Sequence, residues 1–259
     1  MSGHRLVSRS GSSRCLKSQL VNLASPGLPG LPGVPGPPGP SRRASSPAKK
    51  RQCAPCRRAY VLPAVTRRHN PLLLSPTPSL PERIGVVGAG TIGPDIAYYL
   101  LGALPGAKVH LVDIAQGPLD AARARLDGYA KKGVAKRKLT EAQAAGVMEN
   151  LSPTLDYGAL AGCDLVIEAA TEDLPLKRRI FGQLEDVLGD EALITSNTSS
   201  LPASRIFDQL AHPERATVTH FFAPAFSNPA VEVIRAEKTA PEVVDYLRWL
   251  LCVTGKVPV

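Results

Sequence analysis

The chain of 259 residues is long enough for one ordinary domain with an extension, or for two small domains. Its net charge of +9 arises in residues 1–81, which hold 13 Lys and Arg and no acidic residue, whereas residues 82–259 hold 18 basic and 22 acidic residues. The mildly acidic second part argues against nucleic-acid binding. The five cysteines argue against a disulfide framework, and no apolar run reaches the roughly 20 residues of a membrane-spanning helix.

Residues 1–81 are predicted to form a disordered tail, because they are basic, of low complexity and hold 14 of the 25 prolines. Three roles stay open for it: an organelle transit segment, a basic arm that touches nucleic acid or membrane, or an extension without a role in the fold. We expect a cytoplasmic protein, or a mitochondrial matrix protein if the tail is a transit segment. Cys53 and Cys56 have the spacing of half a zinc site, but no second pair follows, so we expect no metal site.

Order is predicted to begin near Glu82, where strand and helix patterns start to alternate. The predicted strands are 83–88, 108–112, 164–168, 192–195, 216–222, 231–234 and 257–259. The predicted helices are 95–104, 118–132, 140–151 with Thr140 as N-cap, 176–188, 202–210 and 241–252. This alternation predicts an α/β domain over residues 82–259, with a mostly parallel sheet covered by helices on both faces.

The motif Gly88-x-Gly90-x-x-Gly93 joins the first predicted strand to the first predicted helix. In this context the first glycine permits a tight turn, the second lets a pyrophosphate approach the backbone, and the third allows close packing of helix on strand. The helix N-terminus adds free N–H groups for the phosphates, so Thr91 and Ile92 are expected to contact the cofactor as well. The motif therefore predicts a Rossmann-type, doubly wound sheet that binds a dinucleotide.

Asp113 follows the second predicted strand and supports the same function. A carboxylate at this place accepts hydrogen bonds from the adenosine ribose hydroxyls and repels a 2′-phosphate. The next residue is Ile114 rather than an arginine. The sequence therefore favours NAD over NADP, and the alternative is a glycine turn beside a surface carboxylate.

Three further polar clusters, at 169–173, 196–200 and His220, follow predicted strands. The carboxyl ends of parallel strands form the edge of an open α/β sheet at which ligands bind. His220 is the expected proton acceptor for the oxidation of an alcohol, because imidazole titrates near neutral pH. Glu232 is a candidate to orient the imidazole, and Ser199 is a candidate to hydrogen-bond the substrate oxygen. The spacing leaves a structural histidine and solvated carboxylates open as alternatives.

From about Ile84 to Val259 the sequence resembles the NAD-binding domain of the 3-hydroxyacyl-CoA dehydrogenases. The matching segments are GAGTIG at 88–93, Asp113, VIEAATED at 166–173, SNTSSL at 196–201, HFF at 220–222, VEVI at 231–234 and GKVPV at 255–259. The resemblance implies that an acyl-CoA thioester is the substrate and that NAD oxidises its 3-hydroxyl to give a 3-ketoacyl-CoA, as in fatty acid β-oxidation or butanoate-type metabolism.

The resemblance also implies roles for individual residues. It makes His220 the general base and Glu232 its partner, and Ser199 corresponds to the family's first serine after Asn-Thr. It implies that the cofactor contacts are Gly88, Gly90, Gly93, Asp113, Glu172, Lys177 and Asn197. A related β-hydroxyacid dehydrogenase, or a crystallin-like NAD-binding relative without efficient chemistry, are the alternatives.

This chain departs from the family's pattern in three ways. It has Ala223-Pro224 where the family usually has Asn-Pro after HFF, and Asp95 where a small residue is more usual. The family continues into an all-helical second domain, which completes the acyl pocket and forms the usual homodimer contacts, whereas this sequence ends at Val259. We therefore expect a nearly complete cofactor domain without the C-terminal helical domain, which binds NAD but turns over substrate poorly.

Overall fold

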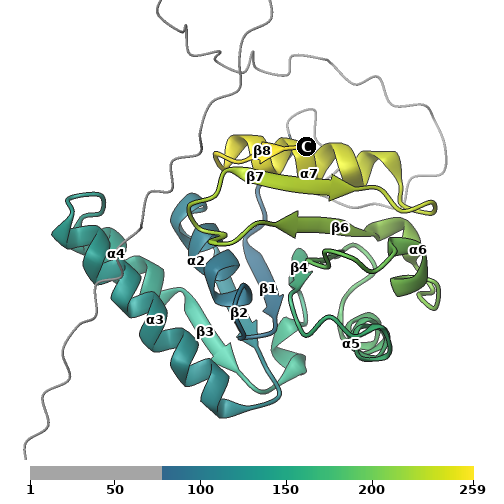
Figure 1. Cartoon of the computed structure of the whole chain (residues 1–259), viewed down its shortest axis with the longest axis horizontal. Coiled ribbons are helices and arrows are strands. Elements are labelled where there is room, and N and C mark those ends of the chain that lie inside the picture. The colour runs from purple at the N-terminus through teal and green to yellow at the C-terminus, as the bar shows by residue number, and fades with distance from the viewer. Residues whose placement is uncertain (1–77) are drawn as a thin grey trace, which may run out of the picture. The chain divides into compact units, whose positions relative to one another are not determined.

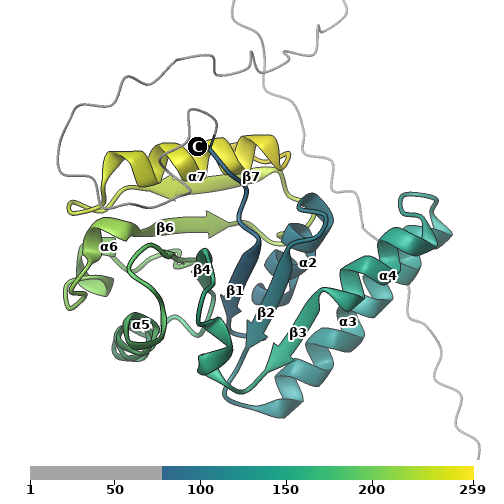
Figure 2. The same ribbon diagram turned by 180° about the vertical axis from the view of Figure 1, so that it is seen from behind.

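The computed structural model describes residues 78–259. The predicted tail, the transit hypothesis and the Cys53–Cys56 pair lie outside these residues, apart from the last few residues of the tail. The described part is an eight-stranded sheet with helices on both faces, so the predicted α/β, doubly wound, mostly parallel architecture is confirmed (Figures 1 and 2).

The sheet has the strand order β3-β2-β1-β4-β5-β6-β7-β8, and all neighbouring strands are parallel except the antiparallel pair β6–β7. The strands are β1 Arg83–Val87, β2 Lys108–Val112, β3 Leu151–Thr154, β4 Leu165–Glu168, β5 Leu193–Ser196, β6 Ala216–Phe221, β7 Ala230–Ile234 and β8 Val257–Pro258. The α-helices are α2 Gly93–Ala103, α3 Gln116–Ala135, α4 Glu141–Glu149, α5 Leu174–Val187, α6 Ala203–Ile206 and α7 Pro241–Val253. Two 3₁₀ helices are η1 Tyr157–Leu160 and η2 Pro213–Arg215.

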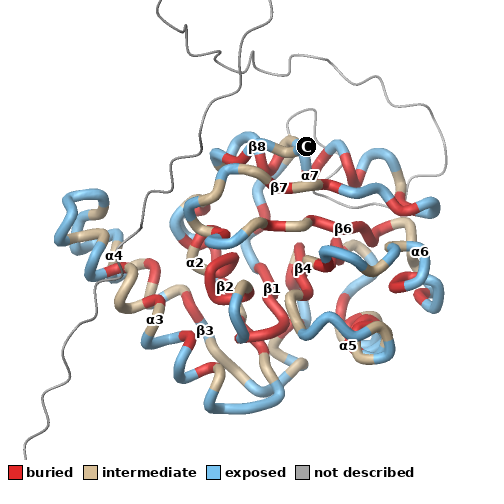
Figure 3. Tube along the Cα trace, viewed as in Figure 1, coloured by how far each residue is buried: buried red, intermediate tan, exposed pale blue. Residues whose placement is uncertain are grey.

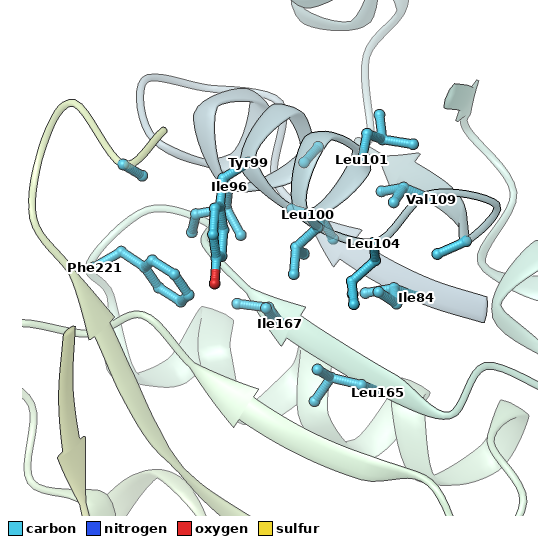
Figure 4. Close-up of a cluster of buried hydrophobic side chains, with 14 of the residues drawn as sticks. Ile84, Ile96, Tyr99, Leu100, Leu101, Leu104, Val109, Leu165, Ile167 and Phe221 are labelled. Atoms are coloured by element: carbon cyan, nitrogen blue, oxygen red, sulfur yellow. The ribbon is translucent and has the colours of Figure 1, made fainter. Parts of the chain in front are cut away.

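Alternate residues of the central strands supply two hydrophobic cores, one on each face of the sheet. Ile84, Leu165 and Leu100 of α2 belong to the same cluster of buried side chains on one face of the sheet (Figure 4). Val166 and its neighbours on the other face pack against Phe181 of α5. Figure 3 shows the result, with burial concentrated in the strands and in the helix faces turned toward them.

Two helix starts are fixed by side-chain caps that the sequence makes recognisable. Thr140 Oγ1 accepts the Gln143 backbone N–H at 3.2 Å, and Gln143 Oε1 accepts the Thr140 N–H at 2.9 Å, so the predicted N-cap of α4 is confirmed as a capping box. Asp173 caps α5 by accepting the Leu176 N–H at 2.8 Å. The Asp173 cap fixes where α5 leaves the edge of the sheet.

Two predictions of local structure were wrong. The helix predicted over 140–151 ends at Glu149, and residues 151–154 instead form β3, which no strand signal revealed. Pro153 is tolerated because β3 lies at the edge of the sheet. The helix predicted over 202–210 is limited to Ala203–Ile206, because the chain turns at Phe207 so that both Phe207 and Leu210 enter the core beside α5.

The core beside α5 yields a stability prediction. Phe181 is 1% exposed and meets the Phe207 ring edge-on, with the centroids 5.0 Å apart. Phe181→Ala should lower the free energy of unfolding by about 3–5 kcal/mol, because it removes buried apolar area and leaves a cavity. Urea denaturation measures this loss, and Val253→Ala, at a residue 54% exposed, serves as the control with little expected change. A loss below about 1 kcal/mol for Phe181→Ala would contradict this packing.

Candidate active site

The glycine loop between β1 and α2 has the shape that a pyrophosphate site requires. Gly88 has a φ of +106°, and a Cβ there would lie 2.7 Å from the Ala169 carbonyl oxygen. A Cβ on Gly93 would lie 1.9 Å from the Gly88 carbonyl oxygen. By contrast, a Cβ on Gly90 would have no heavy atom within 4 Å. Two glycines therefore let the chain pack, and the Gly90 backbone faces open space that a dinucleotide can approach.

A pocket of about 690 Å³ lies against this loop. Of the residues predicted from the sequence, its lining includes Gly88, Gly90, Thr91, Ile92 and Asp113. It also includes residues that the sequence analysis missed, among them Tyr157, Leu176, Arg179, Ile180 and Gln183. The last four share one face of α5 at helical spacing, and this was the signal that could have found them. Tyr157 comes from η1, for which no comparable signal exists.

Asp113 both lines the pocket and holds the loop. Its Oδ2 accepts the Ala89 backbone N–H at 2.7 Å, and its Oδ1 accepts the Ala115 N–H at 3.1 Å. A carboxylate has lone pairs left after two such bonds, so Asp113 can still accept from a ribose hydroxyl. Burial, with the charges of Glu168 and Asp113, raises the pKa of Tyr157 to about 12, so its phenol stays neutral in the pocket wall.

Lys177 is buried and does not line the pocket. Its side chain is 1% exposed, and its Nζ lies 2.7 Å from Glu168 Oε1 and 3.4 Å from Glu172 Oε2. Ser196 Oγ donates to the other oxygen of Glu168 at 2.6 Å. The Lys177 ammonium therefore balances the carboxylates of Glu168 and Glu172. A direct contact of Lys177 with the cofactor stays a prediction.

Glu172 holds the segment that follows β5. Its Oε1 accepts the backbone N–H groups of Ser199 at 3.0 Å and Ser200 at 3.1 Å, and it also accepts the Thr198 hydroxyl. Partial burial alone would raise the pKa of Glu172, but the hydrogen bonds from Thr198 and Ser200 and the charge of Lys177 outweigh it and lower the pKa to about 2. Glu172 is thus ionised at neutral pH, and it holds the backbone at Ser199.

The structure brings His220 and Glu232 together as cross-strand neighbours on β6 and β7. His220 Nδ1 lies 2.8 Å from Glu232 Oε2, and the two side chains are 18% and 42% exposed. Asn197, at the end of β5, joins the same edge by accepting the Phe221 backbone N–H on its Oδ1 at 2.8 Å. Ser199 is exposed on the neighbouring segment, and within residues 78–259 no hydrogen bond links its hydroxyl to His220.

Other kinds of site find no support in the part of the chain that is described. Between residues 78 and 259, no three or more His, Cys, Asp and Glu side chains converge as the ligands of a metal ion would. In the same residues, no helix has both the length and the apolar composition that crossing a membrane requires.

Residues 83–259 match the protein family described as "3-hydroxyacyl-CoA dehydrogenase, NAD binding domain". The chain belongs to this family. The resemblance inferred from the sequence motifs is thereby confirmed, together with NAD as the cofactor of the domain.

Two curated relatives illustrate the match. The 3-hydroxyadipyl-CoA dehydrogenase of Escherichia coli K12 is 39% identical over 182 residues, which are 69% of this chain and 37% of the relative. The fatty acid oxidation complex subunit alpha of Idiomarina loihiensis is 35% identical over 175 residues, which are 68% of this chain and 24% of the relative. The chain therefore spans roughly a quarter to two fifths of the length of these relatives.

Solved structures show the same fold. The 3-hydroxybutyryl-CoA dehydrogenase of Escherichia coli K12 is 37% identical with a TM-score of 0.68, over 70% of this chain and 38% of that chain. The (S)-3-hydroxybutyryl-CoA dehydrogenase of Ralstonia eutropha is 32% identical with a TM-score of 0.66, over 70% of this chain and 63% of that chain.

The open space at Gly90 gives a prediction that separates binding from folding. Gly90→Ala should leave the thermal stability unchanged, because its Cβ would meet no protein atom within 4 Å. The same Cβ should lower the affinity for NADH at least about tenfold, because it occupies the space through which the pyrophosphate approaches the backbone. Gly102→Ala, in α2 and equally without near contacts, is the matched control and should bind NADH normally. Fluorescence titration measures both affinities, and unchanged binding by the Gly90 variant would count against this pyrophosphate site.

The low pKa of Glu172 predicts how stability depends on pH. Because its pKa falls from 4.5 to about 2 on folding, the ionised carboxylate stabilises the fold above pH 4.5, and this contribution disappears as the pH falls toward 2. Glu172→Gln should therefore be less stable than the unsubstituted chain at neutral pH and equally stable near pH 2. Urea unfolding across this range measures the difference. Glu237→Gln, at an exposed residue, is the control, and a difference that persists unchanged at low pH would refute the assignment.

Proposed function

We propose that this protein takes part in the NAD-dependent oxidation of a 3-hydroxyacyl-CoA to a 3-ketoacyl-CoA. When bound, NAD supplies the acceptor for the hydride that leaves the 3-carbon of the substrate. The single observation that carries the proposal is the 2.8 Å contact between His220 Nδ1 and Glu232 Oε2, on the sheet that carries the glycine loop. This pair offers a proton acceptor to a reaction that must release one proton with each hydride.

In this proposal Glu232 sets the tautomer of His220. If Nδ1 donates its proton to the carboxylate, the unprotonated Nε2 remains to take the proton of the substrate hydroxyl. The carboxylate also stabilises the imidazolium that forms, as in other pairs of an acid with a histidine. Glu232 therefore acts through His220, which is the catalytic base.

The neighbouring residues take supporting roles. Gly88, Gly90, Thr91, Ile92, Gly93 and Asp113 bind the pyrophosphate and the adenosine ribose. Asn197 borders the nicotinamide, Ser199 donates to the substrate oxygen, and Glu172 with Lys177 holds the segment that carries Ser199. The hydrogen bonds from the backbone of Ser199 and Ser200 to Glu172 support this arrangement, since they leave little freedom in the segment.

The acyl-CoA substrate is inferred from the relatives. The names 3-hydroxyadipyl-CoA dehydrogenase and 3-hydroxybutyryl-CoA dehydrogenase share a 3-hydroxyacyl group on CoA. The chain spans 37% of the first of these proteins and 38% of the second, so the substrate class is proposed from their names.

The role of His220 is tested by turnover of acetoacetyl-CoA with NADH. In this reductive direction His220 donates the proton that it would accept in the oxidation, so His220→Gln should lower the rate by about 10²–10⁴-fold through loss of general acid–base catalysis. The affinity for NADH should stay within about twofold. His212→Gln, at a histidine outside the proposed site, is the matched control and should keep the rate of the unsubstituted chain. Equal rates for His220→Gln and the unsubstituted chain would exclude His220 as the base. No turnover by either would favour a non-catalytic NAD-binding role.

A further inference from the structure

Helix α2 carries a negative charge where a dinucleotide site needs positive potential. Asp95 is the third residue of α2, and its side chain is only 8% exposed. An acidic residue in the first turn stabilises a helix, but it also cancels part of the positive potential that the N-terminus offers to an anion. The glycine loop ends at this N-terminus, so the charge of Asp95 opposes the binding of a pyrophosphate.

Arg125 of α3 lies against both the acid and the loop. Its Nη2 is 3.7 Å from Asp95 Oδ1. The same nitrogen donates to the carbonyl oxygens of Gly90 at 3.2 Å and Thr91 at 3.0 Å. Because Gly90 and Thr91 also line the pocket, one guanidinium touches the acid and the backbone that would face the cofactor.

The burial of Asp95 strengthens its electrostatic interaction with Arg125. The Tyr129 hydroxyl donates to Asp95 Oδ1 at 3.3 Å, and the Tyr129 ring packs on Phe226 with centroids 4.6 Å apart. Burial raises the pKa of Asp95, while the charge of Arg125 and the Tyr129 hydroxyl act in the opposite direction. Charges in such a partly dry setting are screened less than charges in water. An uncompensated Asp95 carboxylate would therefore act on the loop more strongly than an exposed carboxylate would.

We infer that Arg125 is a positioning residue for the cofactor: it neutralises Asp95, so that the N-terminus of α2 can accept a pyrophosphate. Its donation to the Gly90 and Thr91 carbonyls places the neutralising charge directly beside the loop. The inference rests on the proposed binding of NAD at the glycine loop and extends it to a residue outside the motif. It explains how the chain accommodates a buried acid in the first turn of α2.

A double-mutant cycle on the full chain, read by NADH titration, tests the inference. Arg125→Met should lower the affinity for NADH about tenfold or more, because it leaves the charge of Asp95 beside the loop unbalanced. Asp95→Asn alone should bind NADH as well as the unsubstituted chain, or more tightly. The double variant D95N/R125M should return to within about threefold of the unsubstituted affinity, because it removes the charge that Arg125 balances.

The controls separate this electrostatic role from a purely structural one. Arg123→Met removes an exposed arginine from the same helix and should leave the affinity unchanged. Arg125→Lys keeps the positive charge and should stay within about threefold of the unsubstituted chain. Thermal melting of each variant without NADH reports on the fold independently. Should Arg125→Met fail to fold, Asp95→Asn and Arg125→Lys carry the test, and a marked loss of affinity in either would overturn the inference.

Two further results would overturn the inference while leaving the proposed function intact. One is unchanged NADH affinity in Arg125→Met. The other is a double variant that binds no better than Arg125→Met, since a structural defect is not relieved by removing Asp95. If the unsubstituted chain itself fails to bind NADH, the proposed function fails as well, so the two failures are distinguishable.

Discussion

The arrangement of the site depends on one buried carboxylate, that of Glu168 at the end of the central strand β4. Its side chain is fully buried, and it accepts hydrogen bonds from Lys177 Nζ at 2.7 Å, Ser196 Oγ at 2.6 Å and the Ala170 N–H at 2.7 Å. A buried charge is tolerated only when it is paired and hydrogen-bonded, so these partners have little freedom to move. The end of β4, the end of β5 and the start of α5 are thereby held together at the edge where the ligand is expected.

Lys177 links the buried Glu168 to Glu172, which lies nearer the surface. Lys177 contacts both glutamates, and Glu172 in turn holds the backbone of Ser199 and Ser200. Asn197, which directly follows β5, accepts the N–H of Phe221 on β6, the residue after His220. Polar contacts therefore run from the middle of the sheet to the His220–Glu232 pair. Beyond that pair, Lys256 donates to the carbonyl oxygens of Ala225 and Asn228, which braces the loop between β6 and β7.

The sequence predicted best those parts of the fold that neighbouring residues in the chain determine. The glycine spacing fixed a strand, a turn and a helix together, because Gly88 and Gly93 leave no room for any other residue. Strand β3 escaped prediction because its four residues include Pro153 and become a strand only by pairing with β2. The buried position of Lys177 escaped for a similar reason, since a lysine on an amphipathic helix is usually solvated and only the tertiary fold supplies Glu168 as its partner.

The antiparallel pairing of β6 and β7 determines which sequence changes would keep His220 and Glu232 in contact. His220 and Glu232 meet because they stand opposite one another in the register of β6 and β7, which the loop residues 222–229 connect. A slip by one residue would turn Glu232 to the other face of the sheet and part the two side chains. Insertions or deletions in the connecting hairpin loop are therefore compatible with the chemistry as long as the strands keep their alignment.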